Sequence, residues 1–356
     1  MSIRKFFNTN SYEYCRRCGA NLTMQNGYSN TLARWICKGC GEMLINPEIK
    51  TETDIVWICD NCDATLNIQE GFSEDSGEHI CVNCGYTNKL DDSEVFLSND
   101  EYERFLCDPY RGLSNDSLIE IMQYEEVGFI NDRQDIILVK KIDTDDLYVK
   151  KILSTYNIGV YKFLAENPVE CMPRIYGVYE GKAYLVVIEE YIKGDLLSDI
   201  IGNRTLDEKK AIDIARQLCV ILNQLHSFDE PVIHRDVKPS NVIVNGDGKV
   251  YLLDFNAAKL FKEGEIEDTR LLGTFHYAAP EQLGYGWSAS SVKADVYSLG
   301  VLLNVMVTGK LPKEKCISGP LGDVVVKCVN LNPEERYSVE EVLIALDKAG
   351  EYYGRN

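Results

Sequence analysis

The sequence lacks a hydrophobic segment long enough to cross a lipid bilayer. Its longest apolar stretch, at 296–307, is much shorter than the roughly 20 residues that a membrane-spanning helix requires, and it contains Gly300 and Asn304. We therefore expect a buried core helix there. The residues before Cys15 also lack the apolar core of a secretory signal, so we predict a cytoplasmic protein that its own sequence does not anchor to a membrane.

The sequence also lacks an excess of positive charge. It has 37 Lys and Arg residues against 56 Asp and Glu residues, which gives a net charge of −19. Residues 1–90 are slightly acidic, and most of the acidity lies after them. A protein that binds nucleic acid through its general charge carries the opposite sign, so nucleic acid is not an expected partner. The length of 356 residues allows two or three domains.

Cysteine, in contrast, is abundant, and eight of the 13 cysteines form four C-x-x-C pairs. The pairs are Cys15/Cys18, Cys37/Cys40, Cys59/Cys62 and Cys81/Cys84. Each cysteine of the first two pairs recurs 44 residues later. The segment is therefore a duplicated module.

Two C-x-x-C pairs in each copy supply four thiolates, which is the ligand set of a closed tetrahedral zinc site. The copies resemble zinc ribbons at 11–45 and 55–90, and we predict two structural Zn²⁺ ions, one in each. Disulfides and a rubredoxin-like iron site are the alternatives. Few large apolar side chains lie in these segments, so we expect the metal to provide most of their folding free energy. His79 could replace a ligand, but we interpret it as a surface residue.

The remainder of the chain places strands before helices. Residues 91–119 are polar and acidic, which predicts a linker. In the part that follows, 120–350, apolar and β-branched runs predict a hairpin of strands at 136–142 and 147–152 and a further strand at 184–188. They also predict a second hairpin of strands at 242–244 and 249–253. Apolar residues recur with a helical period over 207–228, where Thr205 and Glu208 could form a capping box. Ser338 and Glu341 could cap the last helix in the same way.

One polar segment stands between the long helix and the second predicted hairpin. It reads HRDVKPSN, at 234–241, and Asp254 follows it in the triplet Asp-Phe-Asn. With these motifs in this order, 120–350 resembles a protein kinase of the Ser/Thr type found in bacteria and eukaryotes. The resemblance implies an α+β fold with two lobes, a small sheet-rich lobe followed by a helical lobe.

The resemblance also implies roles in phosphoryl transfer. Asp236 would orient the substrate hydroxyl and accept its proton, and Lys238 would stabilise the transferred group. Asn241 and Asp254 would hold Mg²⁺, or Mn²⁺, against the phosphates of ATP. Lys150, in the stretch LYVKK, matches the strand lysine that grips the α- and β-phosphates. Further contacts to ATP are implied for Gly128, Ile188 as gatekeeper, Glu190, Ile192 and Ile243.

The segment GTFHYAAPE, at 273–281, is similar to the end of a kinase activation segment. By this resemblance Thr274 would help to recognise the substrate hydroxyl. Thr269 is a candidate for activating phosphorylation, since Arg235 could pair with the phosphate. Structural roles are implied for an ion pair between Glu281 and Arg336, and for Asp295 beneath the catalytic loop.

Three departures from the family pattern affect these expectations. Asn256 replaces the glycine of the metal-binding triplet, but asparagine tolerates a positive φ, so we expect the turn to survive. Of the glycines in the phosphate-covering loop, only Gly128 is present. The helix acid that pairs with Lys150 is missing from 159–161, and the nearest acid is Glu166.

These observations favour an ATP- and Mg²⁺-dependent Ser/Thr protein kinase that acts on proteins, with the zinc ribbons as a docking or regulatory arm for a possible protein partner. The departures leave a pseudokinase scaffold as the alternative. A small-molecule phosphotransferase is disfavoured by Lys238 and by the activation segment, which resemble protein-substrate recognition. A nucleic-acid reader is disfavoured by the acidic balance of the ribbons.

Overall fold

The computed structural model describes residues 4–5, 14–15, 20–29, 34–41, 43–45, 57–62, 64–73, 76–90, 104–261, 273–284 and 290–355. The chain forms two compact units, Met1–Asp108 and Pro109–Asn356. Cys18 and Thr269 lie outside the described residues.

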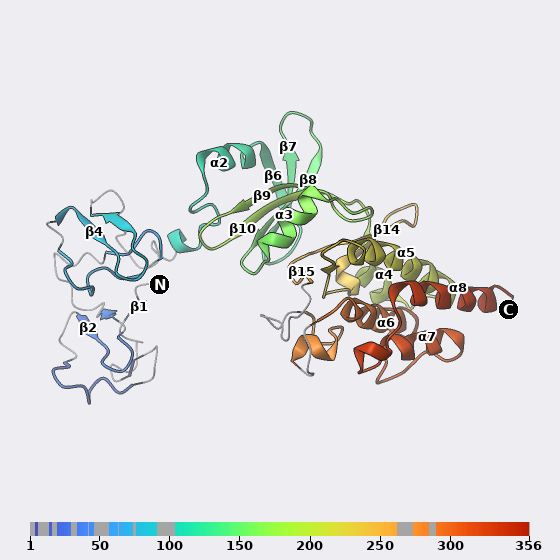
Figure 1. The fold of residues 1–356 in the computed structure, drawn as a ribbon. Coiled ribbons are helices and arrows are strands. Elements are labelled where there is room, and N and C mark those ends of the chain that lie inside the picture. Colours follow the sequence, from blue (N-terminus) through green and yellow to red (C-terminus); the bar gives the residue numbers. More distant parts are fainter. Residues whose placement is uncertain are drawn as a thin grey trace. The chain divides into compact units, whose positions relative to one another are not determined.

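The N-terminal unit contains two small sheets (Figure 1). The strands β1 (Arg4–Lys5), β3 (Met43–Ile45) and β2 (Arg34–Ile36) form a three-stranded sheet in that order. The strands β4 (Glu78–Ile80) and β5 (Thr87–Lys89) form a hairpin. Very short strands with turns between them are what a chain with few large apolar residues can form.

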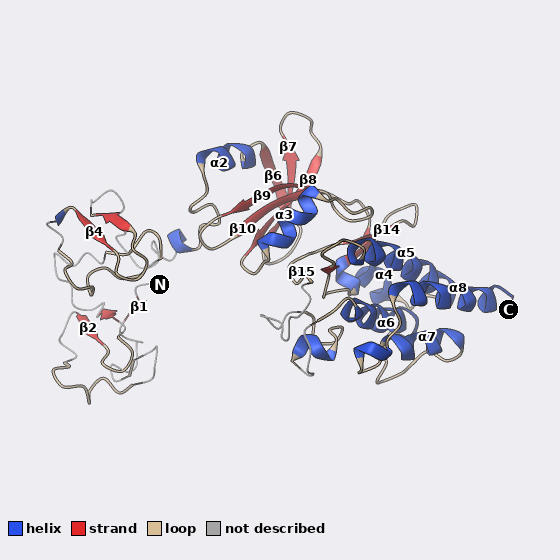
Figure 2. Cartoon of the chain, in the orientation of Figure 1, coloured by secondary structure: helices blue, strands red, loops and turns tan. Residues whose placement is uncertain are grey.

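The C-terminal unit contains a five-stranded antiparallel sheet (Figure 2). Its strands, in spatial order, are β6 (Tyr124–Phe129), β7 (Ile136–Lys141), β8 (Leu147–Leu153), β10 (Leu185–Glu190) and β9 (Ile175–Glu180). The predicted hairpin of β7 and β8 and the predicted strand β10 are therefore confirmed. Helix α3 (Ile158–Glu166) packs against β9.

Residues 109–119, which the sequence placed at the end of the linker, belong to this unit. Helix α2 (Asn115–Ile121) begins at an N-cap, Ser114, whose side chain accepts the amide of Ser117. Before it, the Tyr110 hydroxyl bonds to Lys150 on strand β8 at 2.7 Å. Polar composition alone does not reveal such contacts.

The rest of the unit is mainly helical (Figures 1 and 2). Its helices are α4 (Leu197–Asn203), α5 (Glu208–His226), α6 (Lys293–Thr308), α7 (Pro320–Cys328) and α8 (Val339–Arg355), with 3₁₀ turns η3 (Pro239–Asn241), η4 (Pro280–Leu283) and η5 (Pro333–Glu335). The predicted core helix at 296–307 lies within the buried α6. Within the described part of the chain, no helix is both long and apolar enough to cross a membrane.

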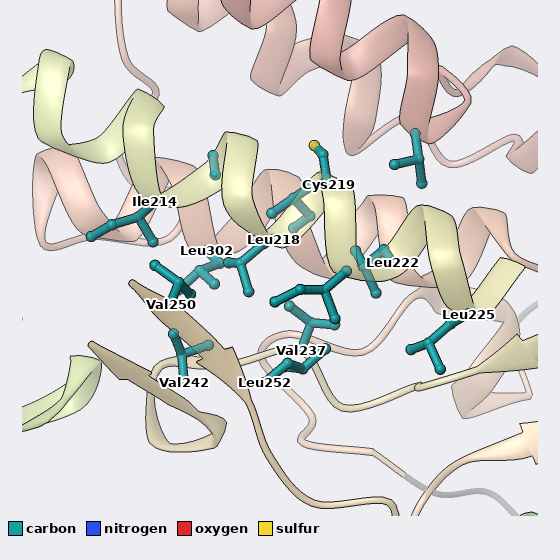
Figure 3. Packing of buried hydrophobic residues seen from close by; sticks show 14 of the residues in the cluster. Ile214, Leu218, Cys219, Leu222, Leu225, Val237, Val242, Val250, Leu252 and Leu302 are labelled. Atoms are coloured by element: carbon teal, nitrogen blue, oxygen red, sulfur yellow. The ribbon is translucent and has the colours of Figure 1, made fainter. Parts of the chain in front are cut away.

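Short strands support the loops that carry the polar motifs. The strands β11 (Asp195–Leu196), β13 (Val242–Val244) and β14 (Val250–Leu252) form one sheet, and β12 (Val232–Ile233) pairs with β15 (Lys259–Leu260). The predicted hairpin of β13 and β14 is confirmed. Figure 3 shows Leu218 and Leu222 of α5 packed over Val242 and Leu252 of this sheet.

The start of α5 differs from the prediction. Its N-cap is Asp207, whose side chain accepts the amide of Lys210 at 2.8 Å, so Thr205 and Glu208 form no capping box. The reason is that the amide of Leu206 donates to the Met306 carbonyl at 2.8 Å, which keeps this part of the chain extended. At α8 the predicted capping box is present between Ser338 and Glu341.

Candidate active site

The loop that follows β12 is held from below by one buried carboxylate. Asp295, in the first turn of α6, accepts the amides of His234 and Arg235 at 2.9 and 2.7 Å. The His226 ring donates to the same carboxylate at 2.8 Å. Burial alone would raise the pKa of Asp295, but its hydrogen bond and charge interaction with His226 lower it. Arg235 has a φ of +67°, so the loop turns sharply just before Asp236.

Asp236 lies at the centre of a hydrogen-bonded group. Its Oδ1 accepts the amide and the hydroxyl of Thr274 at 3.0 and 2.8 Å, and its Oδ2 lies 2.7 Å from Lys238 Nζ. The Lys238 ammonium also donates to the Thr274 hydroxyl at 2.8 Å. Burial would raise the pKa of Asp236, but Lys238 and Thr274 outweigh it and lower this pKa. The structure thus brings together a carboxylate, an ammonium and a hydroxyl from two separate loops.

Asn241 connects this group to the turn that carries Asp254. Its Nδ2 donates to the backbone oxygen and to Oδ2 of Asp236, at 2.9 and 3.0 Å. Its backbone carbonyl accepts the amide of Leu253 at 2.8 Å, which holds Asp254 beside the loop. The Oδ1 oxygen of Asn241 takes no part in these bonds. It can therefore coordinate a metal together with the Asp254 carboxylate, since oxygen ligands suit Mg²⁺.

The Asp-Phe-Asn turn is built differently from the expectation. The residue with a left-handed backbone is Asp254, at φ +69°, and Asn256 is not among the described residues with positive φ. Asn256 instead accepts the hydroxyl of Tyr161, on helix α3, at 2.6 Å. Phe255 is buried and meets the ring of Tyr161 edge-on. In this structure the asparagine side chain accepts a hydrogen bond, and its tolerance of a positive φ is not used.

Two adjacent lysines on β8 lie on opposite faces of the sheet, because side chains alternate along a strand. The Lys150 ammonium bonds to the Tyr110 hydroxyl at 2.7 Å and to Glu126 Oε1 at 2.5 Å. Lys151 Nζ lies 2.6 Å from Glu189 Oε1, and the charge of Asp254 also acts on it. The structure therefore brings Lys151, rather than the predicted Lys150, to the Asp254 turn.

The same alternation places the predicted gatekeeper, Ile188, on the opposite face of the sheet from Lys151. Ile188 is directly opposite Lys150 in the strand register, so the two side chains share a face. Glu189 is opposite Val149 and lies on the face of Lys151. The structure thus places Glu189, and not Ile188, next to the lysine that faces Asp254.

The remaining residues predicted to contact ATP lie in strands β6, β10 and β13 and in the segment that follows β10. The amide and carboxylate of Glu190 are both bonded to the backbone of Arg174. Ile192 is buried. A Cβ on Gly194 would approach Cγ2 of Ile243 to 2.6 Å, so Gly194 allows the segment after β10 to pass close to β13. Gly128, in β6, has open space around it.

The end of the predicted activation segment is attached to the helices. Arg336 forms a bidentate, buried ion pair with Glu281, at 2.6 and 2.9 Å. Gln282 donates to the Arg235 carbonyl at 2.7 Å, which joins the segment to the loop that carries Asp236. Gly273, at φ +126°, allows the chain to turn just before Thr274.

The cysteines of the N-terminal unit gather in two groups. In each group the described Sγ atoms all lie within 4.8 Å of one another. The groups are Cys15, Cys37 and Cys40, and Cys59, Cys62, Cys81 and Cys84. Neighbouring Sγ atoms are 3.6 to 3.7 Å apart, whereas a disulfide requires about 2.05 Å. Tetrahedral zinc with bonds of about 2.3 Å separates its sulfurs by about 3.8 Å, so these groups fit the ion.

A glutamine that the sequence analysis missed supports each group. Gln25 donates to Cys37 Sγ at 3.4 Å, and Gln69 donates to Cys81 Sγ at 3.5 Å. Burial raises the pKa of both thiols, but these bonds and nearby backbone amides lower it to about 6. The Oε1 of Gln69 also lies 3.2 Å from His79, which is buried rather than on the surface. The sequence contains a signal for this role, because Gln25 and Gln69 are 44 residues apart, the same spacing at which the cysteines recur.

Comparison with known proteins agrees with this geometry. Residues 128–345 match the protein kinase domain family. The probable serine/threonine-protein kinase PknB of Lactococcus lactis is 31% identical over 47% of this chain and 27% of its own length. Serine/threonine-protein kinase A of Synechocystis is 39% identical over 39% of this chain, and PrkC of Bacillus subtilis is 30% identical over 48%, each over 28% of its own length.

The chain thus spans little more than a quarter of these relatives. The family match nevertheless covers more than half of this chain and includes Asp236, Asn241, Asp254 and the segment from Gly273 to Glu281. The chain belongs to the protein kinase family.

Proposed function

We propose that this chain is an ATP- and Mg²⁺-dependent serine/threonine protein kinase that transfers the γ-phosphoryl group to hydroxyls of proteins. The observation that carries the proposal is the group of Asp236, Lys238 and Thr274, joined by hydrogen bonds of 2.7 to 3.0 Å. Protein kinases among its relatives support it. A carboxylate, a cation and a hydroxyl at one point are what proton removal from a substrate hydroxyl requires.

Each residue of the group has a separate task. Asp236 accepts the proton of the substrate hydroxyl, and its lowered pKa keeps it ionised for that role. Lys238 stabilises the negative charge on the transferred group. Thr274, bonded to both, positions the hydroxyl that approaches Asp236. These are the steps that the side chains of this chain can perform.

The nucleotide would be held by groups close to the Asp254 turn. We assign the phosphate contact to Lys151 in place of Lys150, because Lys151 faces Asp254. When bound, Mg²⁺ or Mn²⁺ neutralises the charge of the phosphates, and Asn241 and Asp254 would hold it. Gly128 and the backbone at Glu190 and Ile192 stay predictions for ATP contacts, as does Ile243.

We further propose that the N-terminal unit binds two structural Zn²⁺ ions. The four thiolates at Cys59, Cys62, Cys81 and Cys84 are supported by their mutual distances. The first site would use Cys15, Cys18, Cys37 and Cys40. We infer that these modules recruit or regulate through contact with a protein partner.

A nucleotide-binding scaffold without catalysis is the second candidate. It is favoured by two observations, the single glycine of the phosphate loop and the absence of an acid at 159–161 on helix α3. Two assays separate the candidates. One follows labelled phosphate from ATP·Mg²⁺ to a basic protein acceptor, and the other measures nucleotide binding.

The kinase transfers phosphate, and Asp236→Asn lowers the transfer by about 10²- to 10⁴-fold, the usual contribution of a positioned base. Asp254→Asn also abolishes it. Binding without transfer in the wild type would instead establish the scaffold.

A further inference from the structure

We propose that Glu189, on strand β10, positions Lys151 for the phosphates of ATP and replaces an acidic residue on helix α3 in this role. The inference deepens the proposed function, because it concerns the nucleotide site of the same kinase. It makes Glu189 a positioning residue that acts through Lys151.

The pair is set by the register of the sheet. Lys151 Nζ lies 2.6 Å from Glu189 Oε1, and both side chains are more than nine-tenths buried. Strands β8 and β10 are hydrogen-bonded neighbours, with Lys151 opposite Val187 and Glu189 opposite Val149. The two charged residues therefore lie diagonally on one face of the sheet, within reach of each other.

A second carboxylate, that of Asp254, lies near the pair. Its charge acts on both Lys151 and Glu189. It also acts on Tyr161, whose hydroxyl bonds to Asn256 in the same turn. A fixed cation at this point is what phosphate groups next to the metal require.

Helix α3 offers no competing partner. Its acidic residue, Glu166, is exposed at the last position of the helix. The side chain that the helix does send toward the turn is Tyr161, whose hydroxyl donates to Asn256 at 2.6 Å. The charges of Asp254 and Glu189 both act on Tyr161. Helix α3 is therefore connected to the turn by a neutral hydrogen bond, and the lysine receives its carboxylate from a strand.

The pair is not explained by stability. Taking two charges out of water costs so much that a buried ion pair is often no better than apolar residues of similar volume. Glu189 Oε2 is buried and has no hydrogen-bond partner among the described residues, which adds a further cost. A pair that contributes little to folding and lies beside Asp254 points to a role in function.

One consequence concerns control of the site. An ion pair between a helix and a strand forms only when the helix is correctly placed, whereas this pair joins two strands of one sheet. Lys151 is therefore oriented whether or not helix α3 moves.

The test measures the affinity for a fluorescent ATP analogue with Mg²⁺, together with KM for ATP and kcat. Glu189→Gln keeps the shape but removes the charge, and we expect KM and the dissociation constant to rise at least tenfold while kcat falls less. Glu189→Asp keeps the charge and should recover part of the affinity. The matched control is Glu126→Gln, which removes the carboxylate beside Lys150 on the other face and should leave both constants unchanged.

Thermal unfolding shows whether the pair exists, independently of catalysis. Glu189→Gln and Lys151→Met each leave the other residue of the pair buried without its partner, so each should lower the unfolding temperature. The double variant Lys151→Met/Glu189→Met should recover the unfolding temperature but bind no nucleotide. The inference is overturned if Glu189→Gln binds the analogue like the wild type, or weakens no more than Glu126→Gln. Absence of transfer by a wild type that binds the analogue would contradict the proposed kinase activity alone.

Discussion

The side chain of Asn256 links the turn that carries Asp254 to helix α3. Tyr161 is fully buried, and its hydroxyl needs an acceptor inside the protein. Asn256 Oδ1 provides that acceptor, and its backbone amide donates to Asp254 Oδ1 at 3.2 Å. One residue thus satisfies a buried donor and supports the carboxylate that would hold the metal. A glycine at this position could support the carboxylate through its backbone amide, but it could not accept the hydroxyl of Tyr161.

Restoring the family glycine should therefore destabilise this protein. Asn256→Gly leaves the Tyr161 hydroxyl buried without its acceptor, and we expect a loss of about 1–3 kcal/mol in the free energy of unfolding. Urea unfolding measures the loss. Tyr161→Phe combined with Asn256→Gly removes both partners and should recover part of it. Equal stability of Asn256→Gly and the wild type would contradict this account.

The pKa of Asp236 leads to a prediction for acid stability. Its pKa is lowered on folding, below the ordinary value of about 3.9 for aspartate. The ionised carboxylate therefore adds stability above about pH 4, and this contribution is lost as the pH falls through the lowered pKa. Unfolding of the wild type and of Asp236→Asn should be compared from pH 6 to pH 3. The difference in stability should shrink as the pH falls, and a constant difference would contradict the assignment.

At the scale of elements, periodic patterns predicted most of the C-terminal unit. The apolar face of α5, with Leu218 and Leu222, is buried as its helical period indicated. Strand β8 was also predicted correctly, yet the lysine that faces the Asp254 turn is Lys151, whereas the sequence favoured Lys150. A shift of one residue along a strand exchanges its two faces, and the doublet Lys150-Lys151 carries no local signal for which lysine faces Asp254. The faces of the two lysines are shown only by their tertiary partners, Tyr110 for Lys150 and Glu189 for Lys151.

The close packing of helices α6 and α7 was likewise not predicted, because it depends on a tertiary contact at Gly300. Gly300, in α6, lies against α7, because a Cβ there would come within 2.4 Å of Cys328 Cβ. In the sequence, this glycine only interrupts an apolar run. Its physical role is to let two helices approach closely.

Gly300→Ala should therefore push α6 and α7 apart. Overpacking of this kind costs about 1–3 kcal/mol, measurable by chemical denaturation. The control is Gly202→Ala in α4, where a Cβ would meet nothing within 4 Å. That substitution should stabilise the protein or leave it unchanged, since alanine favours a helix by about 1 kcal/mol over glycine. A Gly300→Ala protein as stable as the control would refute the close contact.

At the scale of the whole molecule, the two units have different sources of stability. The C-terminal unit has one large buried core, which includes Leu218, Val242 and Leu302. The N-terminal unit has two small clusters, each formed around two buried cysteines and two buried leucines. The repeat of 44 residues predicted this duplicated organisation, whereas the contacts made by 109–119 could not be read from a polar segment. The metal content stays a prediction.

Removal of zinc should unfold the N-terminal unit and leave the kinase domain folded. Four-thiolate sites supply most of the folding free energy of such small modules, while Leu222 and its neighbours pack without metal. Elemental analysis should find about two Zn²⁺ per chain, and Cys59→Ser should lose one of them. The control, Cys107→Ser, changes an exposed cysteine outside both groups and should keep both ions. Protease digestion after chelation should cut first within residues 1–108.

The most direct test of the kinase assignment is the single-turnover rate of phosphate transfer from ATP·Mg²⁺ to a protein acceptor. It should be measured for the wild type, for Asp236→Asn, and for Asp229→Asn, which changes an exposed carboxylate in the loop before β12. We predict rapid transfer by the wild type and by Asp229→Asn, and a rate at least about 10²-fold lower for Asp236→Asn. Equal rates for all three proteins, or no transfer by any of them, would contradict the role of Asp236.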